Sequence, residues 1–175
     1  MMRQKQFFSI LFFFLFTGVI AQNAPIIKVY AYSQGVLQGT KPTGTIEEGG
    51  KEIKAVADKK LNYFIYAEQK KSTVINIVSI WIKGKNYSAK ASLVSRTPVE
   101  IKTDDPSGST VLVPQSSNKL IMITPGNQKY ASQRPSAFLS KTIASSELII
   151  VYKWNGKIYY SDIKKIKELK TVAAV

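Results

Sequence analysis

The sequence predicts an all-β protein with the architecture of an antiparallel two-sheet β-sandwich, immunoglobulin-like or similar. Runs rich in β-branched and aromatic residues recur along the chain, and clusters of turn-forming residues separate them. Helical periodicity is scarce. Many short strands joined by tight turns are typical of sandwiches and barrels. Because the chain contains no cysteine, the fold class rests on architecture alone, without the cysteine pair of antibody domains.

Residues 1–21 have the three parts of a secretory signal peptide. The segment begins with the cations Arg3 and Lys5, continues as an uncharged run rich in Phe and Leu, and ends at Ala21. The apolar run is shorter than the roughly 20 residues that a transmembrane helix needs, and an uncleaved signal anchor is the alternative. We therefore expect one domain over residues 22–175, exported to the periplasm or the cell exterior. The absence of cysteine favours a bacterial envelope and a soluble chain without a lipid anchor.

The charge points to an anionic partner. The chain has 25 Lys and Arg against 11 Asp and Glu, a formal net charge of +14, and the signal peptide accounts for two of the cations. Beyond it, Arg96 and Arg134 are the Arg residues and all other cations are Lys. Recognition of bases and phosphates favours Arg, and lysine-rich surfaces also serve solubility alone. We expect an envelope protein or an anionic glycan as partner, and nucleic acid is the least expected anion.

Residue type and alternation identify the strands up to residue 124. Residues 26–33 and 61–68 are rich in β-branched and aromatic residues. Residues 74–83 are apolar on both faces, which predicts a central strand covered on both sides. In residues 87–94, apolar and polar residues alternate with a period of two, which predicts one buried and one solvated face. Shorter strands are expected at residues 99–103, 110–113 and 119–124.

The segment after these strands, residues 126–146, is the longest polar stretch of the chain. Pro125-Gly126 is predicted to form a turn at its start. Residues 137–143 are the candidate for a short strand that divides this long loop.

The clearest local signal is a β-hairpin within residues 147–162. Asn155-Gly156 lies between two strand-like runs, and both residues accept the positive φ angles of a type I′ turn. A two-residue loop fixes the register, so four cross-strand pairs are expected: Val151–Tyr160, Tyr152–Tyr159, Lys153–Ile158 and Trp154–Lys157.

The C-terminal segment, residues 163–170, has two structural interpretations. Ile163, Ile166 and Leu169 would share one side of a short helix docked on the sheet, and the same residues could extend the last strand. Because lysines surround these apolar residues, contact with an anionic membrane surface is the alternative role of the segment.

The residue types argue against catalysis. His and Cys are both absent, which excludes the commonest general base, thiol nucleophiles and nearly every zinc or copper site. Two Ser-x-x-Lys strings, at Ser116 to Lys119 and Ser161 to Lys164, are about as frequent as chance predicts, and the companion strings of penicillin-binding enzymes are absent. We expect no catalytic residue, no cofactor and no metal ion.

Carboxylates are the remaining candidates for chemistry. The adjacent pairs Glu47-Glu48 and Asp104-Asp105 lie beside Gly or Pro in predicted turns, where acidic side chains commonly bond the local backbone. A glycosidase needs two carboxylates on opposite sides of a sugar, and their spacing does not indicate this. A calcium site at Asp104, Asp105 and Ser107 is the other possibility for these carboxylates, but the three residues lack the spacing of a calcium-binding loop. Because carboxylates are the remaining reactive groups, a carboxylate-dependent glycan-active enzyme is kept as the alternative function.

The sequence favours an exported, non-catalytic binding or accessory module of a bacterial cell envelope. Its partner-binding surface is expected on the C-terminal hairpin, where aromatic rings and a lysine gather: Tyr152, Trp154, Lys157 and Tyr159. Aromatic cross-strand pairs also stabilise hairpins without any ligand, so this face has a structural interpretation as well.

Overall fold

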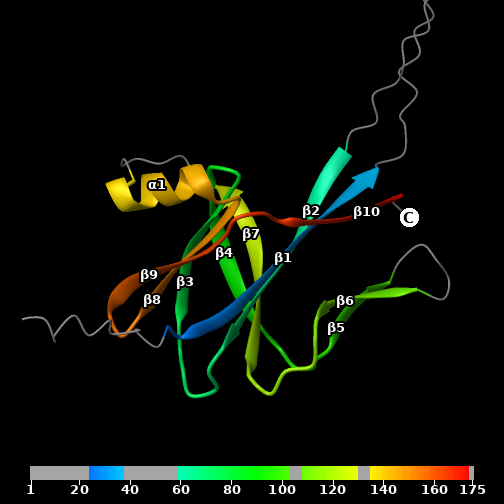
Figure 1. Cartoon of the computed structure of the whole chain (residues 1–175), viewed down its shortest axis with the longest axis horizontal. Coiled ribbons are helices and arrows are strands. Elements are labelled where there is room, and N and C mark those ends of the chain that lie inside the picture. Colours follow the sequence, from blue (N-terminus) through cyan, green and yellow to red (C-terminus); the bar gives the residue numbers. More distant parts are fainter. Residues whose placement is uncertain (1–23, 38–58, 103–107, 130–134, 174–175) are drawn as a thin grey trace, which may run out of the picture.

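The computed structural model describes residues 24–37, 59–102, 108–129 and 135–173 (Figure 1). The predicted signal peptide and both adjacent carboxylate pairs lie outside these residues. The described part contains ten strands and one helix. They are β1 (Ile26–Leu37), β2 (Lys59–Gln69), β3 (Asn76–Ile82), β4 (Lys85–Val94), β5 (Val99–Lys102), β6 (Ser109–Val113), β7 (Lys119–Gln128), α1 (Ala137–Ser145), β8 (Leu148–Trp154), β9 (Lys157–Ile163) and β10 (Lys167–Ala173).

Eight of the strands form one continuous sheet in the order β10-β1-β2-β7-β4-β3-β8-β9. β9 and β10 are consecutive in the sequence, yet they occupy opposite edges of this sheet. In a flat sheet those edges would be about 34 Å apart, whereas the four peptide steps from Ile163 to Lys167 span at most about 14 Å. The sheet must therefore curl until its edges approach, and β9 contacts β1 (Figure 1).

Side chains from the inner face of the curled sheet form the main core. Ile65, Ile80, Leu148 and Ile150 have no exposed surface. Ile166, in the segment that joins β9 to β10, is 2% exposed and packs in the same cluster. The crossing segment is thus anchored by burial of an apolar side chain, which is worth roughly 1.5–3 kcal/mol for a residue of this type.

The outer face is covered in two places. The hairpin of β5 and β6 places Leu112 and Val113 against Tyr66 and Leu120, and these four residues form a second buried cluster. Helix α1 packs on β8, where Ile149 is 1% exposed on the outer side of the strand. The part of the outer face formed by β1 and β10 is less deeply covered, because its tyrosines are only partly buried.

The prediction of a mostly β-strand fold is confirmed, but the described residues include one helix, and they do not show two antiparallel sheets packed face to face. Strands expected in two sheets hydrogen-bond into one, and the second described sheet consists of β5 and β6. The antiparallel expectation is wrong for β1 and β10, which pair in parallel. Residue patterns identify strands without naming their partners, and the parallel pair arises because the chain crosses between sheet edges before β10 begins.

The C-terminal hairpin has the predicted turn and register. Asn155 and Gly156 have φ angles of 47° and 78°, as a type I′ turn requires. All four expected cross-strand pairs are present: Val151–Tyr160, Tyr152–Tyr159, Lys153–Ile158 and Trp154–Lys157. A two-residue turn is decided by adjacent residues, so its register could be derived from the sequence alone.

The structure corrects the strand expected at residues 137–143 and decides between the two interpretations of the C-terminal segment. Residues 137–143, expected as a strand, lie in helix α1, whose N-cap Ser136 accepts a hydrogen bond from the backbone N–H of Leu139 at 3.3 Å. The C-terminal segment forms strand β10 instead of a short helix. It does so because β1 provides an edge for pairing, with Gln34 opposite Leu169.

Two predictions about local exposure and turns also differ from the structure. Leu93 of β4 is 66% exposed, although Tyr87 at the other end of the strand packs against the core as expected. Pro125-Gly126 does not form a turn and instead lies within β7, opposite Ala89 of β4. The β2–β7 pairing covers β7 only as far as Ile123, so the missing N–H of Pro125 lies where β7 has one neighbour.

Candidate functional site

The predicted partner-binding residues of the hairpin face the inside of the curled sheet. Tyr152 is 1% exposed and belongs to the main core. The Tyr159 ring stacks on Tyr152 at 5.8 Å between centroids and meets Trp154 at 5.6 Å. Trp154 and Tyr159 are partly buried against the core, and Lys157 is exposed. The structure therefore brings the aromatic residues together in a packed cluster, and Tyr152 has no free surface for a partner.

A second group of aromatic and cationic residues lies on the outer face of β1 and β10. We call Lys28, Tyr30, Tyr32 and Lys167 the lysine–tyrosine face. The Lys28 ammonium lies 4.9 Å from the Tyr30 ring centroid, and the Lys167 ammonium lies 6.0 Å from that of Tyr32. These are the cation–aromatic contacts of the described residues. Lys28, Tyr30 and Tyr32 alternate along β1. Sequence reasoning missed the face because Lys167 joins it only through the parallel pairing of β1 with β10.

Structural hydrogen bonds hold both tyrosine rings in place. The Tyr30 hydroxyl donates to the Glu68 carboxylate at 3.1 Å, and the Tyr32 hydroxyl donates to the Leu112 carbonyl of β6 at 2.6 Å. Burial and then the Glu68 carboxylate raise the pKa of Tyr30 to about 12, and burial raises that of Tyr32. Both hydroxyls therefore stay protonated as donors at neutral pH, and the rings are oriented without a ligand.

Glu68 is the buried carboxylate of this region. It is 8% exposed and accepts hydrogen bonds from Ser116 at 2.5 Å, from the Asn118 amide at 2.7 Å and from Tyr30. The Ser116 and Asn118 bonds are the main causes that lower the pKa of Glu68, against the opposing effect of burial. Thr97 joins the cluster through reciprocal bonds with the Ser116 backbone. The carboxylate thus connects β1, β2 and the loop before β7.

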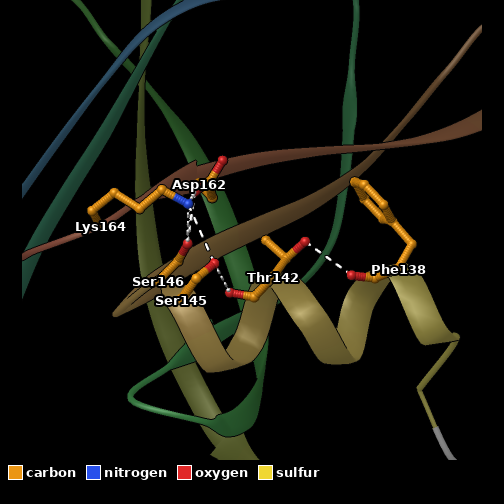
Figure 2. A network of polar contacts seen from close by, with 6 residues as sticks. All are labelled: Phe138, Thr142, Ser145, Ser146, Asp162 and Lys164. Atoms are coloured by element: carbon orange, nitrogen blue, oxygen red, sulfur yellow. Dashed lines mark hydrogen bonds and ion pairs between the residues drawn. The ribbon is translucent and has the colours of Figure 1, made fainter.

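A polar network also connects the end of α1 with the β9–β10 crossing (Figure 2). Lys164 Nζ lies 2.8 Å from the Asp162 carboxylate and donates to Ser146 Oγ at 3.1 Å, while Ser146 Oγ donates to Asp162 at 2.7 Å. The hydrogen bonds from Lys164 and Ser146 lower the pKa of Asp162. A Ser–Lys catalytic pair needs a neutral lysine as base. Lys164 is instead engaged in an ion pair with the Asp162 carboxylate and in hydrogen bonds to Ser145 and Ser146.

This network is expected to contribute little through its ion pair and more through its buried hydroxyl. Lys164→Met should lower the free energy of unfolding by less than about 1 kcal/mol, because the lysine side chain is 70% exposed. Ser146→Ala should cost about 1–2 kcal/mol, because Ser146 is 8% exposed and its bond to Asp162 is lost. Urea unfolding of both variants measures the difference, and a larger cost for Lys164→Met would contradict this ranking.

The residues of the two Ser-x-x-Lys strings form hydrogen bonds outside the serine–lysine pair of each string. Ser116 bonds Glu68 and Asn118, and Lys164 bonds Ser145 and Ser146, which lie outside its own string. The Ser161 side chain forms a hydrogen bond with Tyr152. Glu47-Glu48 and Asp104-Asp105, the two carboxylate pairs, lie outside the described residues.

Within the described ranges, no group of three or more acidic side chains could hold a metal ion. A shallow depression of about 440 Å³ lies beside Lys165, Ile166, Lys167 and Glu168. It is open to solvent and adjoins the lysine–tyrosine face through Lys167. In the same described part of the chain, no helix combines the length and apolar character needed to span a membrane.

The chain matches no protein-family model, and neither the curated proteins nor the solved structures give a match.

Proposed function

We propose that this protein is an exported, non-catalytic binding or accessory module of a bacterial cell envelope, which contacts an envelope protein or an anionic glycan. One observation supports an anionic partner most strongly: the chain has a large excess of cations over anions, and many of its lysines are exposed. Exposed lysines would accelerate the encounter with an anionic partner.

The use of the polar groups supports binding over catalysis. Glu68 is occupied by three neutral donors, and Asp162 by Ser146 and Lys164. Each cluster joins segments that are distant in the sequence, which is a structural task. The membrane-peripheral alternative through residues 163–170 is weakened because Ile166 is buried in the core and β10 is paired with β1.

The test measures retention of the chain from Gln22 to Val175 on immobilised polyuronate and on neutral dextran. We expect retention on polyuronate that decreases as salt rises from physiological to about 0.5 M, because exposed charges are screened beyond about 8 Å at physiological salt. Equal retention on dextran, or none on either polymer, would overturn the glycan arm. Release of new reducing ends that Glu47→Gln or Asp104→Asn abolishes would instead support the carboxylate enzyme.

Export is tested on the full chain, which includes residues 1–21. The intact mass of the protein from an envelope fraction should correspond to a chain that begins at Gln22. A mass that retains residues 1–21 would support the signal-anchor alternative.

A further inference from the structure

We propose that the lysine–tyrosine face of β1 and β10 is a binding site for an anionic polysaccharide, with sugar rings on Tyr30 and Tyr32 and carboxylate or sulfate groups on Lys28 and Lys167. The inference deepens the function proposed above and rests on it. It replaces the hairpin as the location of the contact, because Tyr152 is buried and the rings of the hairpin pack on one another.

Geometry makes the two rings suitable for a linear polymer. Tyr30 and Tyr32 are two residues apart on the outer face of β1, which separates them by about 7 Å along the strand. Both pack partly against the cluster beneath the β5–β6 hairpin. An ammonium group lies over each ring, and both lysines are exposed, so we infer that a ligand reaches each ring from the side on which its lysine lies. The apolar faces of successive sugar units can stack there.

The two tyrosine rings of the site are held in place before any ligand arrives. The hydroxyls of Tyr30 and Tyr32 are fixed by Glu68 and by the Leu112 carbonyl. Ordering side chains on binding costs free energy and reduces affinity. Because these rings are already ordered, binding of a ligand would not include that cost. The lysine side chains are long and exposed, so each ammonium can move from its ring to an anionic group of the ligand at small cost.

Charge favours an anionic occupant. Lys28 and Lys167 belong to no ion pair among the described residues. Lys60, exposed on β2 opposite Val36, adds a third cation to the same side of the sheet. Two carboxylates lie close to these cations. Glu68, which interacts electrostatically with Lys28, is buried and bonded to three donors, and Glu168, next to Lys167 in β10, is exposed. A neutral glycan would leave these cations without an anionic partner. The cations of this face are lysines, whose compact ammonium groups can each meet a separate anionic group along a polymer.

The experiment compares two matched pairs of lysine substitutions by titration with a polyuronate oligomer. Lys28→Gln with Lys167→Gln removes the proposed cations, and Lys153→Gln with Lys157→Gln removes the same charge from the hairpin. We expect the first pair to weaken binding at least about tenfold and the second to weaken it less than about threefold. Ring proton signals of Tyr30 and Tyr32 should shift when the oligomer is added to the wild-type chain.

Each other result has a separate meaning. Equal losses in both double variants would overturn this site and leave the proposed function intact, because the attraction would then be diffuse. Failure of the wild-type chain to bind any polyuronate would remove the glycan arm of the proposed function itself. Binding to vesicles with anionic headgroups but not to polyuronate would assign the face to a lipid surface and overturn the proposal. Melting temperatures of all variants identify any loss that comes from unfolding.

Discussion

Truncation after Asp162 is expected to destabilise the domain by several kcal/mol. The truncated chain loses strand β10, which pairs with β1 along five residue pairs. It also loses Ile166, which is 2% exposed, and removal of such a side chain from a core costs about 2–5 kcal/mol by itself. Leu169, which packs on the outer cluster, is removed as well. Domains are stable by only about 5–15 kcal/mol, so little or no folded protein should remain at 37 °C.

Thermal and urea unfolding, followed by fluorescence of Trp81 and Trp154, measure this effect. A chain that ends at Ala173 is the matched control, because it retains all of β10, and its stability should equal that of the full chain. Ile166→Ala should reproduce a large part of the loss, and Leu169→Ala a smaller part, since Leu169 is only partly buried. A chain truncated after Asp162 that keeps its melting temperature but no longer associates with envelope fractions would show that the segment binds a partner instead.

Replacement of Glu68 by alanine is expected to cost at least about 3 kcal/mol. The change leaves the donors of Tyr30, Ser116 and Asn118 without their acceptor in a buried site. Hydrogen bonds to a charged group contribute roughly 1.5–3 kcal/mol each, although their sum is not additive. Glu68→Gln keeps the side-chain volume and one acceptor oxygen, so its cost should be smaller. Glu100→Gln, at an exposed carboxylate that accepts from Ser109, is the control and should change stability by less than about 0.5 kcal/mol.

The same carboxylate predicts acid sensitivity. Hydrogen bonds from Ser116 and Asn118 lower the pKa of Glu68 below its ordinary value of 4.5, so the folded state binds its proton less readily than the unfolded state. The stabilisation is therefore complete above about pH 5 and is lost as the pH falls through the folded pKa. The melting temperature of the wild-type chain should decrease over that range, and the decrease should be smaller in Glu68→Gln. Asp162, whose pKa is lowered in the same direction, should account for part of the remaining slope. An unchanged slope in Glu68→Gln would show that the carboxylate contributes nothing to the pH dependence.

The sequence by itself determined the features that depend on neighbouring residues. Asn155-Gly156 specified both the turn and the register of the last hairpin, because two residues with positive φ angles leave one pairing of the flanking strands. The runs of β-branched and aromatic residues located the strands from β1 to β7, apart from the ends of β1 and β7, which extend further than expected. Composition also determined which reactive groups are missing, since a chain without His and Cys has few routes to catalysis.

Only the tertiary structure decided which strands pair and which polar groups meet. Ile163, Ile166 and Leu169 fit a helix or a strand, and the free edge of β1 made the strand more favourable by satisfying its backbone groups. That pairing placed Lys167 over Tyr32, although the two residues are far apart in the sequence. Glu68 likewise meets Ser116 and Asn118 across about fifty positions. Such contacts follow from the curvature of the sheet and the crossing between its edges, which no local pattern of residues encodes.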